Sequence, residues 1–233
     1  ITENGRLIAR LHRGDATQKP IRELPVVSLT GIVREVETEQ AGPLRAVIRL
    51  SGDYVPLPGS AGAWPDSAGN PLSFTLRLYF YKGIESVQLV HSFVFRGDHE
   101  RDFISGIGIE FGVPFRESLY NRHVGFTTTE GGIWREPVQP LVTRHPLQLE
   151  GIRNTANHQA AGNRIPEIMP GQQPAWDWVN HLPAWDGFKL NQLHPGGFTI
   201  LKRTQNSSSW LQATTGKRAD GMAVVADVSG GIA

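Results

Sequence analysis

Apolar and polar residues alternate with a period of two in many runs along the sequence, and this alternation constrains the fold more than any other feature. Clear alternating runs are residues 25–37, 43–50, 72–81 and 85–95. A period of two places successive side chains on opposite faces of a β-strand, whereas a helix needs a period of about 3.6. Further runs of the same kind cover residues 4–13, 103–111, 133–142, 198–204, 209–214 and 221–227.

About ten or more strands with hardly any helix predict two packed antiparallel sheets. We therefore expect an all-β fold: a large antiparallel two-sheet β-sandwich of the super-sandwich type, with long loops and little helix. The 26 Gly and 16 Pro residues among 233 agree with this expectation, because both residue types favour turns. Residues 54–71 are predicted to form a long loop, and a short helix is expected near residues 154–161.

Charge and cysteine content exclude several classes of protein. The formal net charge is +1 and no Lys/Arg cluster exceeds three residues, so the sequence indicates neither a nucleic-acid partner nor an anionic membrane partner. The absence of Cys excludes disulfides, thiolate metal sites and thiol nucleophiles. No apolar run approaches the roughly 20 residues that a membrane-spanning helix requires.

The two ends of the sequence indicate a segment of a longer protein. The chain begins at Ile1 rather than at Met, and it stops after Ala233 without an obvious terminal element. We therefore expect further domains on both sides. Extracellular, periplasmic and bacterial cytoplasmic locations all remain compatible with the sequence.

The densest group of chemically active side chains lies in residues 119–126, which read LYNRHVGF. In a strand, Asn121 and His123 would share one face, opposite the apolar pair Val124 and Phe126. We expect the polar face to look into a cleft or into water. An amide beside an imidazole can bind a carboxylate and move a proton. The alternative is a hydrogen-bonding role at the surface or in the core, which is the commoner fate of such residues.

Metal and cofactor sites are not supported by any motif. The Gly106–Gly108 segment lacks the third glycine and the following helix of a dinucleotide-binding loop. Asp98, Glu100 and Asp102 alternate around His99, but solvated loop charge is commoner than metal ligation for such a pattern. We therefore predict no metal and no cofactor.

Tryptophan and arginine residues in the second half of the chain are candidates for substrate binding. Trp176, Trp178 and Trp185 lie close together in sequence among polar neighbours. Their rings can stack on sugar C–H surfaces, or they can cap the end of a sandwich core. Arg203 and Arg218 can each clamp a carboxylate with two hydrogen bonds, or they can form surface ion pairs.

An ordered set of motifs resembles a known family. The motifs are His91-Ser92-Phe93-Val94-Phe95, Gly97-Asp98, Asp102-Phe103-Ile104, Gly106-Ile107-Gly108, Val113-Pro114, Asn121-Arg122-His123-Val124, Glu136-Pro137-Val138, Lys202-Arg203-Thr204, Ser209-Trp210, Gly216-x-Arg218-Ala219-x-Gly221 and Ser229-Gly230-Gly231. This order resembles the exo-rhamnogalacturonan lyase family (the YetA-like proteins, polysaccharide lyase family 26). The resemblance extends from about residue 24 to the end of the chain.

The resemblance implies a protein of three parts. Residues 24–233 would be the central β-sandwich, which stops before a C-terminal α/α toroid that this chain lacks. Residues 1–23 would be a possible last strand of a preceding barrel-like domain. The implied partners are these N-terminal and C-terminal domains and an acidic polysaccharide or oligosaccharide. The parent protein is expected to be a polysaccharide lyase, and this segment alone is expected to be inactive.

The implied reaction is β-elimination at galacturonate in rhamnogalacturonan. It needs a group that neutralises the carboxylate, a base for the C5 proton and an acid for the leaving O4. Asn121 or Arg122 would neutralise the carboxylate, His123 would be the base and Tyr120 the acid. Two alternatives stay open: a non-catalytic structural or carbohydrate-binding sandwich, and an aldose-epimerase-like enzyme with a His–carboxylate pair across one cleft.

Overall fold

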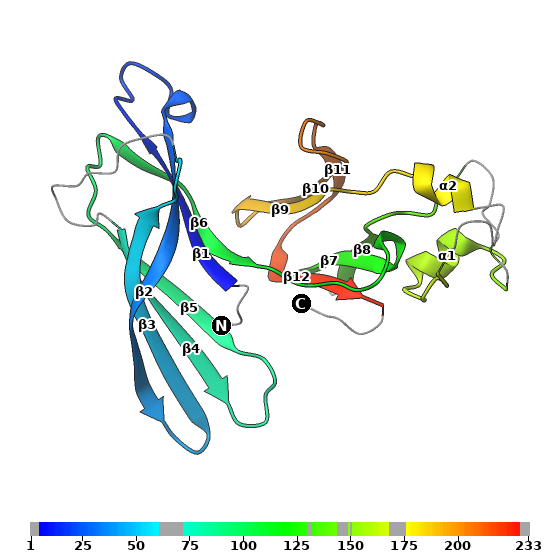
Figure 1. The fold of residues 1–233 in the computed structure, drawn as a ribbon, viewed down its shortest axis with the longest axis horizontal. Coiled ribbons are helices and arrows are strands. Elements are labelled where there is room, and N and C mark those ends of the chain that lie inside the picture. Colours follow the sequence, from blue (N-terminus) through cyan, green and yellow to red (C-terminus); the bar gives the residue numbers. More distant parts are fainter. Residues whose placement is uncertain are drawn as a thin grey trace. The chain divides into compact units, whose positions relative to one another are not determined.

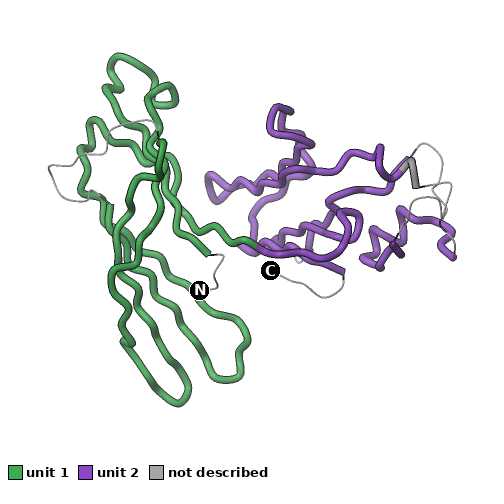
Figure 2. Tube along the Cα trace, in the orientation of Figure 1, with its two compact units in different colours: residues 1–112 green, residues 113–233 purple. Residues whose placement is uncertain are grey.

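The computed structural model of the chain describes residues 5–60, 72–129, 132–143, 149, 151–167 and 176–228, without the side chains of 176–178. The chain divides into two compact units, residues 1–112 and residues 113–233 (Figure 2). Strands dominate both units (Figure 1). No helix in the described segments has the length and apolar character needed to cross a membrane.

Unit 1 is one six-stranded antiparallel sheet in the order β5-β4-β3-β2-β1-β6. Its strands are β1 (Gly5–Arg13), β2 (Val26–Ala41), β3 (Arg45–Pro56), β4 (Leu72–Tyr81), β5 (Gln88–Phe95) and β6 (Asp102–Phe111), with a short 3₁₀ turn, η1 (Ile21–Glu23). The predicted loop over 54–71 begins inside β3, and most of it lies outside the described residues.

The core of unit 1 follows from the alternation seen in the sequence. In β4, every second residue from Leu72 to Leu78 is buried, while the residues between them are half-buried. Ile104 of β6 and Phe95 of β5 pack against the same core, although these strands form the two edges of the sheet. Apolar residues of both edge strands thus extend this core.

The first strand is an interior member of this sheet. β1 pairs with β2 on one side and with β6 on the other. The division that the structure shows falls after Gly112 rather than near residue 23. The assignment of residues 1–23 to a preceding domain stays a prediction.

Unit 2 contains two three-stranded antiparallel sheets in the orders β12-β7-β8 and β11-β10-β9. The strands are β7 (Arg122–Thr128), β8 (Gly132–Pro137), β9 (Gly187–His194), β10 (Gly197–Arg203), β11 (Leu211–Gly216) and β12 (Ala219–Asp227). A 3₁₀ turn, η2 (Leu119–Asn121), leads into β7, and two short helices are α1 (Thr155–Ala160) and α2 (Trp176–His181). The helix expected near 154–161 is present, and Asn154 caps it by accepting a hydrogen bond from the Asn157 amide at 3.0 Å.

The two sheets of unit 2 share an apolar core. Phe126 of β7 packs with Phe198 and Ile200 of β10, and Trp134 of β8 extends this cluster. The rings of Trp134 and Phe188 lie 6.0 Å apart. Side chains of both inner faces thus interdigitate as in a β-sandwich. The predicted all-β antiparallel fold class with little helix is confirmed.

Candidate functional site

The start of β7 differs from the strand expected over 119–126. Residues 119–121 form the η2 turn, and the strand begins at Arg122. The placement of Tyr120 and Asn121 on strand faces was therefore wrong, because alternation does not extend through a 3₁₀ turn. From Arg122 onward the alternation holds: Val124 and Phe126 face the sandwich core, and His123 lies on the opposite face.

Asn121 is a buried structural residue. Its side chain is 1% exposed. Its Nδ2 donates to the Ile165 carbonyl at 2.8 Å, and its Oδ1 accepts from the Ile165 amide at 2.8 Å. The same Nδ2 lies 3.2 Å from Glu117 Oε2. Both ends of the amide are thus occupied in holding a neighbouring loop, so Asn121 has little capacity to bind a substrate carboxylate.

Tyr120 and Arg122 also have structural partners. Tyr120 is buried in a cluster with Leu141 and Ile165. Arg122 donates from Nε to the Glu117 carbonyl at 2.7 Å, and its guanidinium carbon lies 5.7 Å from the centre of the Phe115 ring. The structure does not bring these two side chains together with His123 at one cavity.

His123 lines a cavity of about 350 Å³ on the outer face of the β12-β7-β8 sheet. Its side chain is 2% exposed, and Nε2 lies 3.1 Å from the Gln159 carbonyl. A carbonyl can only accept, so Nε2 carries the hydrogen in the neutral ring. Nδ1 is buried without a hydrogen-bond partner among the described residues. The lone pair of His123 Nδ1 therefore lies at the cavity wall and accepts no hydrogen bond from the described residues.

Arg135 of β8 supplies positive charge to the same cavity. The β7–β8 register places Arg135 opposite Gly125, and both residues line the cavity. Arg135 is exposed, and it forms no ion pair or hydrogen bond with the described part of the chain. Burial, and then the Arg135 charge, lower the pKa of His123, while the hydrogen bond to Gln159 opposes this shift. His123 is thereby favoured as a neutral imidazole beside a cation.

Gln159, Arg135 and Asp227 are the site residues that sequence reasoning missed. The buried Asp227 carboxylate also lines the cavity, and it accepts from the Arg116 and Glu117 amides at 3.0 and 3.1 Å. Gln159 is buried, and its side chain donates to the Tyr120 carbonyl at 2.7 Å and accepts from the Leu141 amide at 2.8 Å. It anchors the end of α1 over β7, where its own carbonyl meets His123. The alternating runs 119–126 and 133–142 form a hairpin whose register would have pointed to Arg135. No local sequence signal points to Gln159.

Comparison with known proteins places the chain. Residues 1–233 match the family model described as the PcRGLX-like protein central beta sandwich domain. The chain belongs to this family. It is also 28% identical over 242 residues to "Uncharacterized protein YetA" of Bacillus subtilis (strain 168). That match covers 100% of this chain and 26% of the relative, so the chain spans about a quarter of that protein's length. The resemblance to the YetA-like, rhamnogalacturonan lyase-like family is confirmed.

In this PcRGLX-like sandwich, the other predicted binding residues are spread over different places. Arg203 lies at the end of β10, where its guanidinium stacks 4.4 Å from the centre of the Trp210 ring and bonds to Asn206. Arg218 is exposed just before β12. Trp185 is half-buried under the ammonium of Lys202, 4.1 Å from the ring centre. None of these side chains lines the His123 cavity.

Two predicted tryptophans lie in α2, where only the backbone is described. The side chains of Trp176 and Trp178 are outside the described residues.

Lys202 also pairs with Glu136 of β8, which joins the two sheets of unit 2 at the end near Trp185. This pair indicates that Trp185 and Lys202 close the end of the PcRGLX-like core.

The acidic residues Asp98 and Asp102 hold the loop around His99 together. The buried Asp102 carboxylate accepts from the Asp98 amide at 3.0 Å, and Arg13 Nε lies 3.1 Å from its other oxygen. The Asp102 amide in turn donates to the Asp98 carbonyl at 2.7 Å. Within the described residues, no group of three His, Asp or Glu side chains is placed to hold a metal ion.

Proposed function

We propose that this chain is the β-sandwich portion of a polysaccharide lyase that cleaves rhamnogalacturonan by β-elimination at galacturonate. The proposal is supported by membership in a rhamnogalacturonan lyase-like family. The observation that carries the catalytic part is the His123 imidazole at the cavity wall, with an unpartnered Nδ1 and a neighbouring Arg135.

The reaction needs charge stabilisation before proton removal. The C5 proton of galacturonate lies next to a carboxylate, so its loss develops a second negative charge. In the proposal, the Arg135 guanidinium binds the carboxylate and stabilises this charge. Arg135 replaces Asn121 and Arg122 in this role, because their polar groups are engaged with Ile165 and Glu117.

His123 is the proposed base. Nδ1 takes the C5 proton, the C4–O4 bond breaks, and a C4–C5 double bond forms. A lowered pKa keeps the ring ready to accept this proton at neutral pH. Nδ1 is shielded from water in this structure, so the sugar has to displace a lining side chain. Arg135, which is exposed, is the side chain best able to move.

The proton for the leaving O4 comes from solvent or from another domain of the parent protein. Tyr120 was the candidate acid, but its side chain packs in the cluster around Leu141 and Ile165 and does not line this cavity. This division of labour agrees with the expectation that the segment alone is inactive.

A non-catalytic structural or carbohydrate-binding role is the second candidate. The occupied hydrogen bonds of Asn121 and the core position of Tyr120 favour a structural role for those residues. The Arg203–Trp210 stack favours surface recognition of an acidic sugar away from the cavity.

The deciding experiment uses the full-length parent protein and rhamnogalacturonan. The formation of unsaturated uronate is followed by absorbance, with and without the C-terminal domain. We expect His123→Gln, which can still donate to the Gln159 carbonyl, to lower turnover by roughly 10²–10⁴-fold. Arg135→Ala should lower it by about 10²–10³-fold.

Two variants serve as matched controls. His194→Ala and Arg153→Ala remove exposed side chains that do not line the cavity, and they should retain wild-type turnover. Wild-type turnover in folded His123→Gln and Arg135→Ala proteins would leave only the non-catalytic role.

A further inference from the structure

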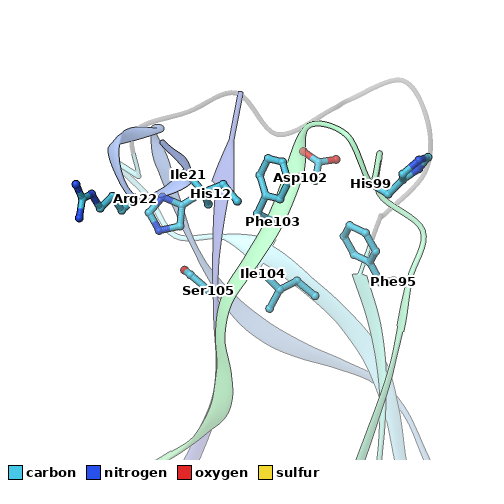
Figure 3. A pocket seen from close by; sticks show the side chains of 9 residues that line it. All are labelled: His12, Ile21, Arg22, Phe95, His99, Asp102, Phe103, Ile104 and Ser105. Carbon is cyan, nitrogen blue, oxygen red and sulfur yellow. The ribbon is translucent and has the colours of Figure 1, made fainter. Parts of the chain in front are cut away.

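Unit 1 carries a depression of about 680 Å³ that is widely open to solvent. It lies at the end of the sheet where β6 begins and β5 ends. Figure 3 shows Phe103 and Ile104 of β6 in the middle of the lining, with Phe95 and His99 on one side and His12, Ile21, Arg22 and Ser105 on the other. Its volume is within the range of roughly 300–1,000 Å³ typical of small-molecule sites.

One wall of this cavity is held in place by the Asp98–Asp102 loop. The buried Asp102 carboxylate fixes the loop through the Asp98 amide and pairs with Arg13. A side chain at Gly97 would come within 2.6 Å of the Phe95 ring, so the ring packs directly on the loop backbone. The loop is therefore preorganised, and preorganisation lowers the cost of binding a ligand.

The charge available to a ligand in this cavity is positive. Asp102 is the one carboxylate among the lining residues, and Arg13 neutralises it. Arg22 is exposed at the rim, and its nearest carboxylate, Glu23, is 3.9 Å away and also exposed. Such a surface pair is weak, so Arg22 can exchange Glu23 for a ligand carboxylate at little cost. The His12 imidazole also lines this cavity, and its Nδ1 lies 3.2 Å from the Leu24 carbonyl.

The apolar part of the lining is aromatic. Phe95 and Phe103 are half-buried, so their rings are held but not fully covered. Aromatic faces that are partly exposed can pack on the C–H surface of a sugar ring, while side chains such as Ser105 and His12 can bind its hydroxyls. The combination of rings, hydroxyl and guanidinium suits a sugar that carries a carboxylate.

We propose that unit 1 carries a second, non-catalytic binding site for a sugar acid, formed by Phe95, Phe103, His12 and Arg22. The choice of ligand rests on the proposed substrate class, whereas the site itself consists only of unit 1 residues. It would hold a further uronate of the polysaccharide without cleaving it.

The test is a titration of the chain, labelled at isoleucine methyl groups, with sodium galacturonate and, separately, with galactose. Ile21 and Ile104 line the proposed site, and Ile133 lines the His123 cavity, so the two sites report separately. We expect galacturonate to shift the Ile21 and Ile104 signals. Galactose, which lacks the carboxylate, should bind about tenfold more weakly, which corresponds to one charge-assisted hydrogen bond.

Matched variants assign the interaction. Arg22→Ala should reduce galacturonate affinity at Ile21 and Ile104 to the level of galactose, and Phe103→Ala should weaken both sugars. Arg34→Ala and Phe80→Ala remove exposed side chains elsewhere in unit 1 and should change neither affinity. His123→Gln should leave these shifts intact, so failure of the proposed lyase site is distinguishable from failure of this site. Unshifted Ile21 and Ile104 signals, or equal affinity for the two sugars, would overturn the proposal.

Discussion

Asn121 and His123 are two positions apart and almost equally buried, yet their side chains have different surroundings. Asn121 has its amide hydrogen-bonded at both ends, whereas His123 keeps one ring nitrogen without a partner. The difference arises from Ile165 and Gln159, which follow 44 and 36 residues later. Burial alone therefore does not separate a structural polar residue from a chemically available one, whereas its hydrogen-bond partners do.

Replacing Asn121 tests its structural role. Asn121→Ala leaves the buried Ile165 N–H and C=O groups without their partners, and each such group costs about 1–3 kcal/mol. We expect the free energy of unfolding to fall by about 2–4 kcal/mol in urea titrations. The exposed Asn163→Ala is the control and should change stability by less than about 0.5 kcal/mol. Equal stability of both variants would contradict the role assigned to Asn121.

After burial, the charge of Arg135 is the next cause of the lowered pKa of His123. A positive neighbour disfavours the imidazolium form, so Arg135→Gln should raise the pKa of His123. In an NMR titration the imidazole should then protonate at higher pH than in the wild type. If His123 is the base, the acid limb of kcat/KM moves to higher pH with it. An unchanged titration would show that the two side chains do not interact.

At the scale of elements, the segment that follows α1 contributes to the wall of the His123 cavity. Gly162 has a φ of 80°, and a Cβ there would lie 2.7 Å from an Arg135 Nη atom. Arg135 therefore packs on a glycine backbone at the rim of the cavity. Gly151 has a φ of 77° but nothing within 4 Å of the corresponding position. Both glycines have a positive φ, but only at Gly162 would a Cβ meet another side chain, that of Arg135.

Alanine substitutions at Gly151 and Gly162 distinguish the cost of backbone strain from the effect of a clash with Arg135. Gly151→Ala and Gly162→Ala should each lose about 1 kcal/mol of stability, because an alanine tolerates a positive φ poorly. Gly162→Ala alone should also displace Arg135 and change the pKa of His123. The measurements are urea unfolding and imidazole NMR titration. A changed pKa of His123 in both variants, or in neither, would contradict the contact between Gly162 and Arg135.

The elements also show what the sequence could and could not predict. The alternation in β4 predicted its buried face, and the β-branched and aromatic runs predicted most strands. The same rule failed at Tyr120 and Asn121, because no local pattern announces the η2 turn. The position of Arg135 at the cavity could have been predicted from the pairing register of the hairpin. The position of the Gln159 carbonyl could not, because it depends on where tertiary packing places helix α1. The sequence thus predicted His123 as a candidate but not its surroundings.

At the scale of the whole chain, each unit has a core made of its own residues. The buried cluster of unit 1 includes Leu11 and Leu76, and that of the unit 2 sandwich includes Phe126 and Ile200. In the described part of residues 113–233, the two sheets pack on each other through residues of unit 2 alone. Stability is therefore expected to be set separately in the two units.

Core truncations test this independence. Leu11→Ala and Ile200→Ala should each cost about 2–5 kcal/mol, because both side chains are fully buried. In native-state hydrogen exchange, Leu11→Ala should lower protection in β3 and β4 and leave β7 and β10 unchanged, and Ile200→Ala should do the reverse. Loss of protection in both units from either variant would indicate a single cooperative unit.

The packing of Arg135 on Gly162 also has an evolutionary consequence. A side chain at position 162 would force the end of the Arg135 side chain to turn away, so a homologue with a larger residue at 162 should place its residue 135 differently at the cavity rim. Because the positive φ at 162 favours glycine whatever residue stands at 135, we expect glycine at 162 to persist even in homologues that lose the arginine.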